Sequence, residues 1–333
     1  DCRPDRLMTG LIVSAESWPI RGGFAISRGA KTTADVVLVE LRDGGFAGRG
    51  ECVPYAHYGE SCDSVIEQIE SLRPAVRQGL DREQLQTGLP PGAARNAMDC
   101  ALWDLQAKVS RRRVWELLEL PPAQPLTTAY TLSLGSPESM YKAALENTDR
   151  PLLKLKLGGE GDIERVRAVR EGAPRGRLIV DANEGWDVDL YQRLVPELIP
   201  FGVEMIEQPL AADADDALKS LPRPIPVCAD ESCHTTESLA RIVDRYDMIN
   251  IKLDKTGGLS EALRLRKAAE AEGLGIMVGC MLATSLAMAP ATLVAQGAAI
   301  VDLDGPLLLE NDRQPGLRFD NNLVYPPSCE LWG

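Results

Sequence analysis

From residue 126 to about residue 305 the chain repeats one unit, a short apolar segment followed by a helix-like segment. The apolar segments are nearly continuous, which is typical of strands that are buried on both faces. A succession of such strands and helices predicts a parallel barrel wrapped in helices. We expect its strands at Thr127–Leu132, Leu152–Leu157, Leu178–Asp181, Val203–Glu207, Pro226–Asp230, Met248–Leu253, Gly275–Gly279 and Ile300–Asp304.

The N-terminal third has a different pattern and predicts a separate α+β domain. A strand from residue 11 to 19 is followed by a glycine-rich loop, Arg21–Ala30, and by a hairpin that turns at Asp43–Gly45. Apolar stripes then predict helices, including one over Ala94–Arg112. The proline-rich segment Leu120–Pro125 marks the boundary. We therefore expect a capping domain at 1–122, a barrel domain at 123–310 and a C-terminal segment at 311–333 that packs back on the capping domain.

Composition narrows the partners and the compartment. The net charge of −13 argues against nucleic acid or an anionic membrane as a partner, and no apolar run is long enough to span a bilayer. The eight cysteines are scattered without a metal-ligand spacing, so we expect a cytoplasmic protein. Oligomeric state stays open, with a homo-oligomer as one alternative, and we do not expect Asp1 to be the native start.

Carboxylates end three successive expected strands. They are Asp181, Glu207 and Asp230, and the active site of such a barrel lies at this end of the strands. Each one alone is compatible with a helix cap, but three buried together would repel without a counter-charge. The chain has only two histidines, and all-oxygen ligation points to Mg²⁺, with Mn²⁺ as the alternative.

Lysines end the second and sixth expected strands. Lys154 and Lys156 share one face of their strand because side chains alternate, and Lys252 would face them across the barrel. Two amines on opposite sides of a metal-bound carboxylate suit proton removal and return at the α-carbon, through a metal-stabilised enediolate. Desolvation and a positive neighbour such as Lys154 are expected to lower the pKa of the lysine base.

These motifs resemble those of the enolase superfamily, and the resemblance covers nearly the whole chain. It implies an α+β capping domain over a (β/α)7β modified TIM barrel, the architecture expected above. It also implies metal ligation by the three strand-end carboxylates and acid–base roles for Lys156 and Lys252, with Lys154 beside them. Lys255 is the rival of Lys252, but it follows the strand and we expect it to face a helix.

The last two expected strands resemble those of one subgroup of the superfamily. Gly275–Met281 carries no histidine, as in the muconate-lactonizing subgroup, and Val301-Asp-Leu-Asp-Gly305 resembles the eighth strand of dipeptide epimerases. That resemblance implies that Asp302 and Asp304 hold the free α-ammonium of a substrate. Two carboxylates on one strand face are costly without a cation to bind, which agrees with it.

The capping segments Pro19–Glu40 and Gly50–Ser61 resemble the loops of dipeptide epimerases that act on L-Ala-D/L-Glu. There a loop arginine pairs with the glutamate side chain of the substrate, and Arg28 stands at the matching place. Thr131 and the main chain around Cys280 and Leu282 match further substrate contacts.

The resemblance therefore implies Mg²⁺-dependent conversion of L-Ala-D-Glu to L-Ala-L-Glu, a small-molecule dipeptide reaction that fits recycling of murein peptides. Rivals within the superfamily are an N-acylamino-acid racemase, an o-succinylbenzoate synthase or a cycloisomerase, none of which needs an ammonium site. A Schiff-base aldolase using Lys156 and a non-catalytic barrel are the alternatives from other classes.

Overall fold

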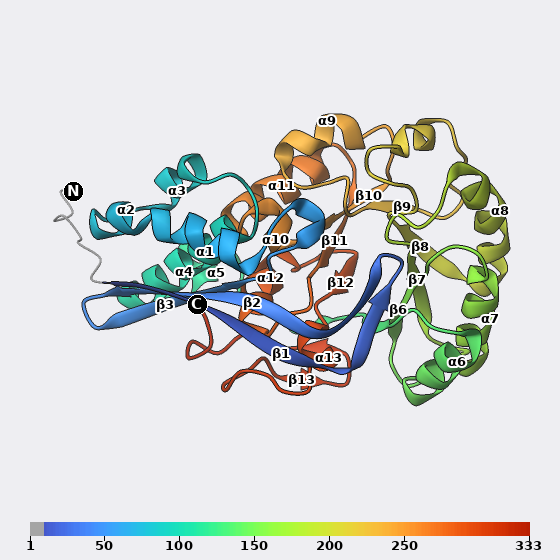
Figure 1. Ribbon diagram of the computed structural model, residues 1–333, viewed down its shortest axis with the longest axis horizontal. Coiled ribbons are helices and arrows are strands. Elements are labelled where there is room, and N and C mark those ends of the chain that lie inside the picture. Colours follow the sequence, from blue (N-terminus) through green and yellow to red (C-terminus); the bar gives the residue numbers. More distant parts are fainter. Residues whose placement is uncertain (1–9) are drawn as a thin grey trace.

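The computed structural model describes residues 10–333, so Cys2 and the first nine residues of the expected capping domain lie outside it. Figure 1 shows a long antiparallel sheet with helices α1 to α5 on one side of the molecule and a barrel ringed by helices on the other. The helices beside the sheet are α1 (Cys62–Ser71), α2 (Arg73–Arg77), α3 (Arg82–Gly88), α4 (Ala93–Ser110) and α5 (Val114–Leu117).

The barrel is a single parallel sheet of eight strands in sequence order, which confirms the expected fold class. The first and last strands meet where the Ala129 amide donates to the Val301 carbonyl over 2.8 Å. The strands are β5 (Tyr130–Leu132), β6 (Leu152–Lys156), β7 (Arg177–Asp181), β8 (Val203–Glu207), β9 (Val227–Ala229), β10 (Met248–Ile251), β11 (Gly275–Gly279) and β12 (Ile300–Asp302).

Helices follow the strands around the outside of the barrel, as the repeat predicts. A short 3₁₀ helix at Asp215–Lys219 takes the place of an α-helix after β8. The α-helices are α6 (Pro137–Glu146), α7 (Asp162–Gly172), α8 (Val188–Leu198), α9 (Leu239–Ile242), α10 (Leu253–Thr256), α11 (Leu259–Ala271), α12 (Ser285–Val294) and α13 (Gly305–Leu308), and further 3₁₀ turns lie at Ala56–Tyr58, Ile199–Phe201 and Thr236–Ser238.

Strand alternation divides the barrel interior into an apolar floor and a polar mouth. The floor is one packed cluster with a residue at each strand: Ala129, Leu152, Ile179, Met205, Cys228, Met248, Met277 and Ile300. Side chains two residues apart point to the same face of a strand. The next inward layer is therefore Thr131, Lys154, Asp181, Glu207, Asp230, Asn250, Gly279 and Asp302. Two residues along each strand therefore separate the apolar core from the layer of polar and charged side chains.

The first expected barrel strand is divided in the structure. Residues Leu126–Thr127 form β4, which pairs with β14 (Leu323–Val324), itself paired with β13 (Phe319–Asp320). Only Tyr130–Leu132 enters the barrel. The partner changes at Thr128, whose amide donates to the Asn322 carbonyl and whose hydroxyl accepts from the Leu303 amide. The single apolar run predicted one strand. Its two halves pair with different partners and therefore form two strands.

The glycine-rich loop expected at Arg21–Ala30 is also different. It is the end of a long hairpin made by β1 (Gly10–Ile26) and β2 (Gly29–Asp43), with Ser27 and Arg28 at the tip. A register shift between Pro19 and Phe24 takes up the extra residues, and Gly22 and Gly23 there have φ of 69° and 77°. The glycines therefore shape a bulge in a strand. The hairpin is bonded to the loop after β5, where the Leu134 amide donates to the Ala25 carbonyl.

The capping sheet is completed by β3 (Phe46–Cys52), which lies against α4 because two glycines permit close approach. A Cβ on Gly50 would stand 2.0 Å from the Ala97 carbonyl oxygen. The other face of α4 binds the barrel, where Arg95 donates to the Thr256 carbonyl. The C-terminal segment packs on the same helix, since the Trp332 indole donates to the Cys100 carbonyl. Within residues 10–333, none of the helices combines the length and apolar character needed to cross a bilayer.

Candidate active site

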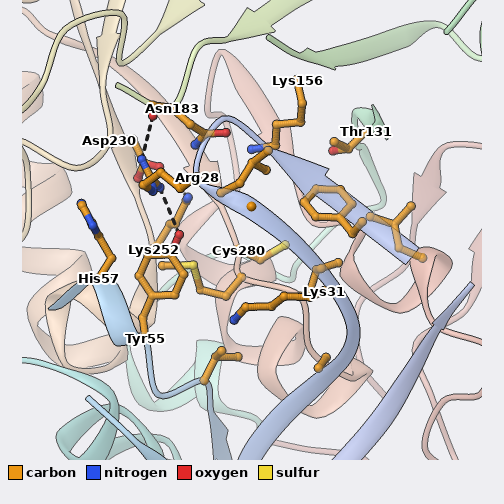
Figure 2. Close-up of a pocket in the computed structure, with 18 of the residues that line it drawn as sticks. Arg28, Lys31, Tyr55, His57, Thr131, Lys156, Asn183, Asp230, Lys252 and Cys280 are labelled. Carbon is orange, nitrogen blue, oxygen red and sulfur yellow. Dashed lines mark hydrogen bonds and ion pairs between the residues drawn. The ribbon is translucent and has the colours of Figure 1, made fainter. Parts of the chain in front are cut away.

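A cavity of about 390 Å³ lies between the barrel mouth, the β1–β2 hairpin and the segment after β3 (Figure 2). Most of the predicted site residues line it. These are Arg28, Thr131, Lys154, Lys156, Asp230, Lys252, Cys280, Leu282, Asp302 and Asp304. Asp181 and Glu207 lie deeper and reach the cavity through Lys154, whose ammonium is 3.2 Å and 2.7 Å from them.

Each of the two predicted acid–base lysines pairs with a different strand-end carboxylate. The Lys156 ammonium donates to Asp181 Oδ2 over 2.6 Å, and the Lys252 ammonium donates to Asp230 Oδ2 over 2.6 Å. Lys156 ends β6, and Lys252 follows β10 on another side of the barrel. The two amines therefore reach the cavity from separate strands.

Lys154 lies within ion-pair distance of three carboxylates of the polar layer. Its ammonium is buried and lies 2.8 Å from Asp302 Oδ2 as well as close to Asp181 and Glu207. One cation thus bridges strands β7, β8 and β12 at the level of the polar layer. Lys154 is positioned as the predicted positive neighbour of Lys156, two residues away on the same face.

Lys255 was expected to face a helix, and this was wrong. The single turn α10 carries it back toward the mouth, where its ammonium is 2.6 Å from Asp230 Oδ1 and 2.9 Å from the Asn250 carbonyl. It does not line the cavity and is almost fully buried. Asp230 is therefore held between two lysines, one open to the cavity and one behind it.

The electrostatics of this layer follow from burial and these pairs. Burial raises the pKa of Asp181, but the charges of Lys156 and Lys154 outweigh it and hold that pKa at about 2. Burial, with the charge of Asp181, raises the pKa of Glu207 to about 7. The expected lowering of the lysine pKa is not seen at Lys252, because the charge of Asp230 outweighs desolvation and raises it.

The donor set fits a hard divalent cation. The acids buried at the mouth outnumber the buried lysines, even with Arg28 counted, and a bound cation would stabilise their charged forms. Residues 10–333 contain no preformed trio of His, Cys, Asp or Glu at metal-binding distance, since each carboxylate is turned toward a lysine. The acids are Asp181, Glu207, Asp230, Glu231, Asp302 and Asp304, and the lysines are Lys154, Lys156, Lys252 and Lys255.

The predicted aspartate pair lies on the wall formed by β12. Asp304 Oδ2 accepts from the Thr131 amide over 2.6 Å, and Asp302 accepts from Lys154 through one oxygen. The other oxygen of Asp302, Oδ1, is buried and has no hydrogen-bond partner among the described residues. This wall therefore retains capacity for a cationic group, and burial together with the charge of Asp302 raises the pKa of Asp304 to about 7.

Arg28 sits at the hairpin tip and reaches residues that the sequence analysis had not singled out. Its guanidinium contacts Glu231 at 2.7 Å, Glu184 at 3.0 Å and the Tyr55 hydroxyl at 3.0 Å. A signal for two of these was present, because Glu231 directly follows Asp230 and Glu184 lies three residues after Asp181. Acids placed just beyond a strand-end carboxylate border the same mouth.

A capping domain over a parallel barrel, with lysines and carboxylates at the strand ends, defines a barrel enzyme of the acid–base type. The family model for the mandelate racemase / muconate lactonizing enzyme N-terminal domain matches residues 8–119, and the enolase C-terminal domain-like model matches residues 140–328. The chain belongs to the enolase superfamily.

Its relatives are named for reactions on dipeptides or on an N-acetylated amino acid. The chain is 46% identical over 315 residues to the L-Ala-D/L-Glu epimerase of Escherichia coli (strain K12), which covers 94% of this chain and 98% of the relative. It is 44% identical over 301 residues to the N-acetyl-D-glutamate racemase of Pseudoalteromonas sp, which covers 90% and 95%. The crystal structure of an enolase family member from Agrobacterium tumefaciens with homology to dipeptide epimerases, holding sodium and L-Ala-L-Glu, matches with a TM-score of 0.96 at 54% identity, over 97% of this chain and 99% of that one.

Proposed function

We propose that this protein is a Mg²⁺-dependent dipeptide epimerase that interconverts L-Ala-D-Glu and L-Ala-L-Glu by inverting the α-carbon of the C-terminal residue. The observation that carries the proposal is the pair of lysines, each 2.6 Å from a different strand-end carboxylate and both on the wall of one cavity. We assign the capping domain to residues 1–122, the catalytic barrel to 123–310 and the returning C-terminal segment to 311–333.

The two lysines divide the proton transfer between the faces of the substrate. One takes the α-proton from one face and the other returns a proton to the opposite face, so the α-carbon inverts. Asp181, Glu207 and Asp230 would hold the Mg²⁺, which supplies positive charge against the substrate carboxylate and the negative charge that develops there. Lys154 adds a fixed ammonium beside Lys156 and stabilises the same developing charge.

The β12 wall recognises the other end of the dipeptide. Asp302 and Asp304 both line the cavity. Asp302 Oδ1 is buried and has no hydrogen-bond partner among the described residues. The free α-ammonium of a dipeptide is the part of the substrate that matches these carboxylates. A charge-assisted hydrogen bond of this kind contributes roughly 1.5–3 kcal/mol.

A second candidate is racemisation of N-acetylglutamate, which the 44% identical relative favours through its name. The same two lysines and metal would serve both reactions, because both exchange the proton α to a carboxylate. The dipeptide carries a free α-ammonium, whereas the acetylated nitrogen of N-acetylglutamate carries no charge. The β12 aspartates therefore favour the dipeptide, since an N-acyl substrate offers them no cation.

The decisive experiment is proton exchange in D₂O with Mg²⁺, followed by NMR on L-Ala-L-Glu, L-Ala-D-Glu and both enantiomers of N-acetylglutamate. We expect each dipeptide to take up one deuteron at the C-terminal α-carbon and to form its epimer, faster than the acetyl compounds. Exchange in N-acetylglutamate at an equal or higher rate would replace the dipeptide assignment with the racemase. Absence of exchange in every compound would reject both.

Replacement of Asp304 tests the ammonium site. We expect Asp304→Asn to lower kcat/KM for L-Ala-L-Glu by about 10²-fold, because the amide still accepts from the Thr131 amide but no longer carries charge. Turnover of N-acetyl-L-glutamate serves as the internal control and should fall far less. A comparable loss for both substrates would show that Asp304 supports the site without binding the ammonium.

We place the reaction in the cytoplasm, in recycling of murein peptides. The free, buried thiols of Cys52, Cys100, Cys228 and Cys233 support a reducing compartment. Growth on L-Ala-D-Glu as the nitrogen source, compared between cells with and without the gene, checks this placement.

A further inference from the structure

Lys255 is a buried cation at the barrel mouth that the proposed reaction does not use. Its side chain is 0% exposed and does not line the cavity. Its ammonium donates to Asp230 Oδ1 over 2.6 Å, to the Asp230 carbonyl, and to the Asn250 carbonyl over 2.9 Å. An ammonium has three N–H groups, so all of its donors are used on these two residues.

These contacts fix the orientation of the Asp230 carboxylate. Asp230 follows β9, and the pairing of β9 with β10 ends at Ala229 and Ile249, so pairing within the sheet does not hold it. Because its carbonyl and its Oδ1 accept from the same ammonium, the carboxylate can rotate only if a buried hydrogen bond is broken. The other oxygen, Oδ2, is left to the cavity-lining Lys252, which lies 2.6 Å from it.

A second carboxylate is connected to Lys255 through Asn250. The Asn250 carbonyl accepts from Lys255, and the Asn250 side-chain amide donates to Glu207 Oε1 over 2.8 Å. Both residues are buried. Lys255 therefore supports two of the three strand-end carboxylates, Asp230 by direct contact and Glu207 through one intervening residue.

The turn that carries Lys255 is itself held by the capping domain. Within α10, Asp254 Oδ1 accepts from the Asn96 side chain over 2.8 Å, and the Thr256 carbonyl accepts from Arg95 over 2.8 Å. Asn96 and Arg95 both belong to the long helix α4. The residues on either side of Lys255 are thus bonded to a rigid element, so Lys255 is a fixed support for Asp230.

We propose that Lys255 is a positioning residue that holds Asp230 with Oδ2 toward the cavity and thereby increases the affinity of the mouth for Mg²⁺. The assignment rests on the proposed function, in which Asp230 is a metal ligand, and gives a role to a lysine outside the acid–base pair. Partners that orient a metal ligand from behind typically change metal affinity when they are replaced. The charge of Lys255 acts in the opposite direction, because an ammonium near the site repels a cation.

Calorimetric titration of EDTA-treated protein with Mg²⁺, in the absence of substrate, separates these two effects by their sign. We expect Lys255→Met to raise the Kd for Mg²⁺ by about 10-fold or more, because Asp230 is no longer held in one orientation. Loss of charge alone would lower the Kd instead. The matched control is Lys108→Met, which also removes a lysine from a buried aspartate, Asp104, at 2.7 Å but on α4, away from the cavity. Its Kd should stay within about 2-fold of wild type.

Lys255→Gln is the second variant, and it keeps the test decisive if Lys255→Met does not fold. Its amide offers two N–H groups to the three acceptors and carries no charge, so its Kd should lie between those of Lys255→Met and wild type. A Kd equal to or lower than that of wild type, in Lys255→Met or, if that variant does not fold, in Lys255→Gln, would overturn the assignment. A wild type that binds no Mg²⁺ would instead overturn the metal site of the proposed function, so the two failures are distinguishable.

Discussion

Lys156→Ala and Lys252→Ala are each expected to lower the rate of net epimerisation by about 10³-fold or more, because inversion needs a proton taken from one face and returned to the other. The structure gives each lysine its own carboxylate, Asp181 or Asp230, so the two amines act as separate groups. Each variant should still exchange the α-proton of one epimer with D₂O through the lysine that remains. The epimer that exchanges should differ between the two variants, and ¹H NMR of both dipeptide epimers measures it.

Lys255→Met is the matched control for this prediction. Lys255 shares Asp230 with Lys252 but does not line the cavity, so its loss changes the charge around Asp230 without removing an amine from the substrate. We expect it to slow both epimers to a similar extent. If Lys156→Ala and Lys252→Ala both racemise the substrate at the wild-type rate, the two-base assignment is wrong. Face-specific loss in Lys255→Met would assign the second base to that lysine instead.

The barrel was predictable because its strands carry two signals at once. A nearly continuous apolar run marks a strand buried on both faces, and the charged residue at its end marks the mouth. Lys154 lies two residues after the floor residue Leu152, and Asp181 lies two residues after Ile179. The period of two therefore predicts which charged side chains share a layer, without knowledge of the strand order.

The features that the sequence did not predict depend on the direction of a turn or on contacts between residues far apart in the chain. The turn after β10 sends Lys255 back to Asp230, and nothing in the local pattern distinguishes this from a turn that points outward. Arg28 lines the cavity, and its four contacts come from three other segments of the chain, which the local sequence does not identify. Glycines at 22 and 23 suggest a loop equally well as a bulge, and only pairing of β1 with β2 decides between them.

The pKa of the buried lysines also depends on contacts that the sequence does not contain. Desolvation predicts a lowered pKa, and this holds for an isolated buried ammonium. In this barrel the carboxylates of the same layer lie within hydrogen-bond distance, and their charge acts in the opposite direction on Lys252 and Lys154. Which influence dominates depends on distances that the sequence does not contain.

Removal of the metal is the second prediction with a large expected effect. We expect EDTA to lower epimerisation by about 10³-fold or more, and Mg²⁺ to restore it, because several kcal/mol of charge stabilisation would be lost. The structural reason is the excess of buried acids at the mouth, where Asp181, Glu207 and Asp230 end three neighbouring strands. Mn²⁺ should restore activity as well, since it accepts the same oxygen ligands.

Thermal unfolding provides a measurement of the same site that does not depend on turnover. Mg²⁺ at about 100 times its dissociation constant stabilises the folded state by about 2.7 kcal/mol, so Tm of the wild type should rise by several degrees. Glu207→Gln keeps the shape of the side chain and removes one charge, so most of this rise should disappear. Glu164→Gln, an exposed change on α7, should leave the rise unchanged. Full activity of the metal-free enzyme, or an equal Mg²⁺-induced rise in Glu207→Gln and wild type, would contradict metal binding by these three carboxylates.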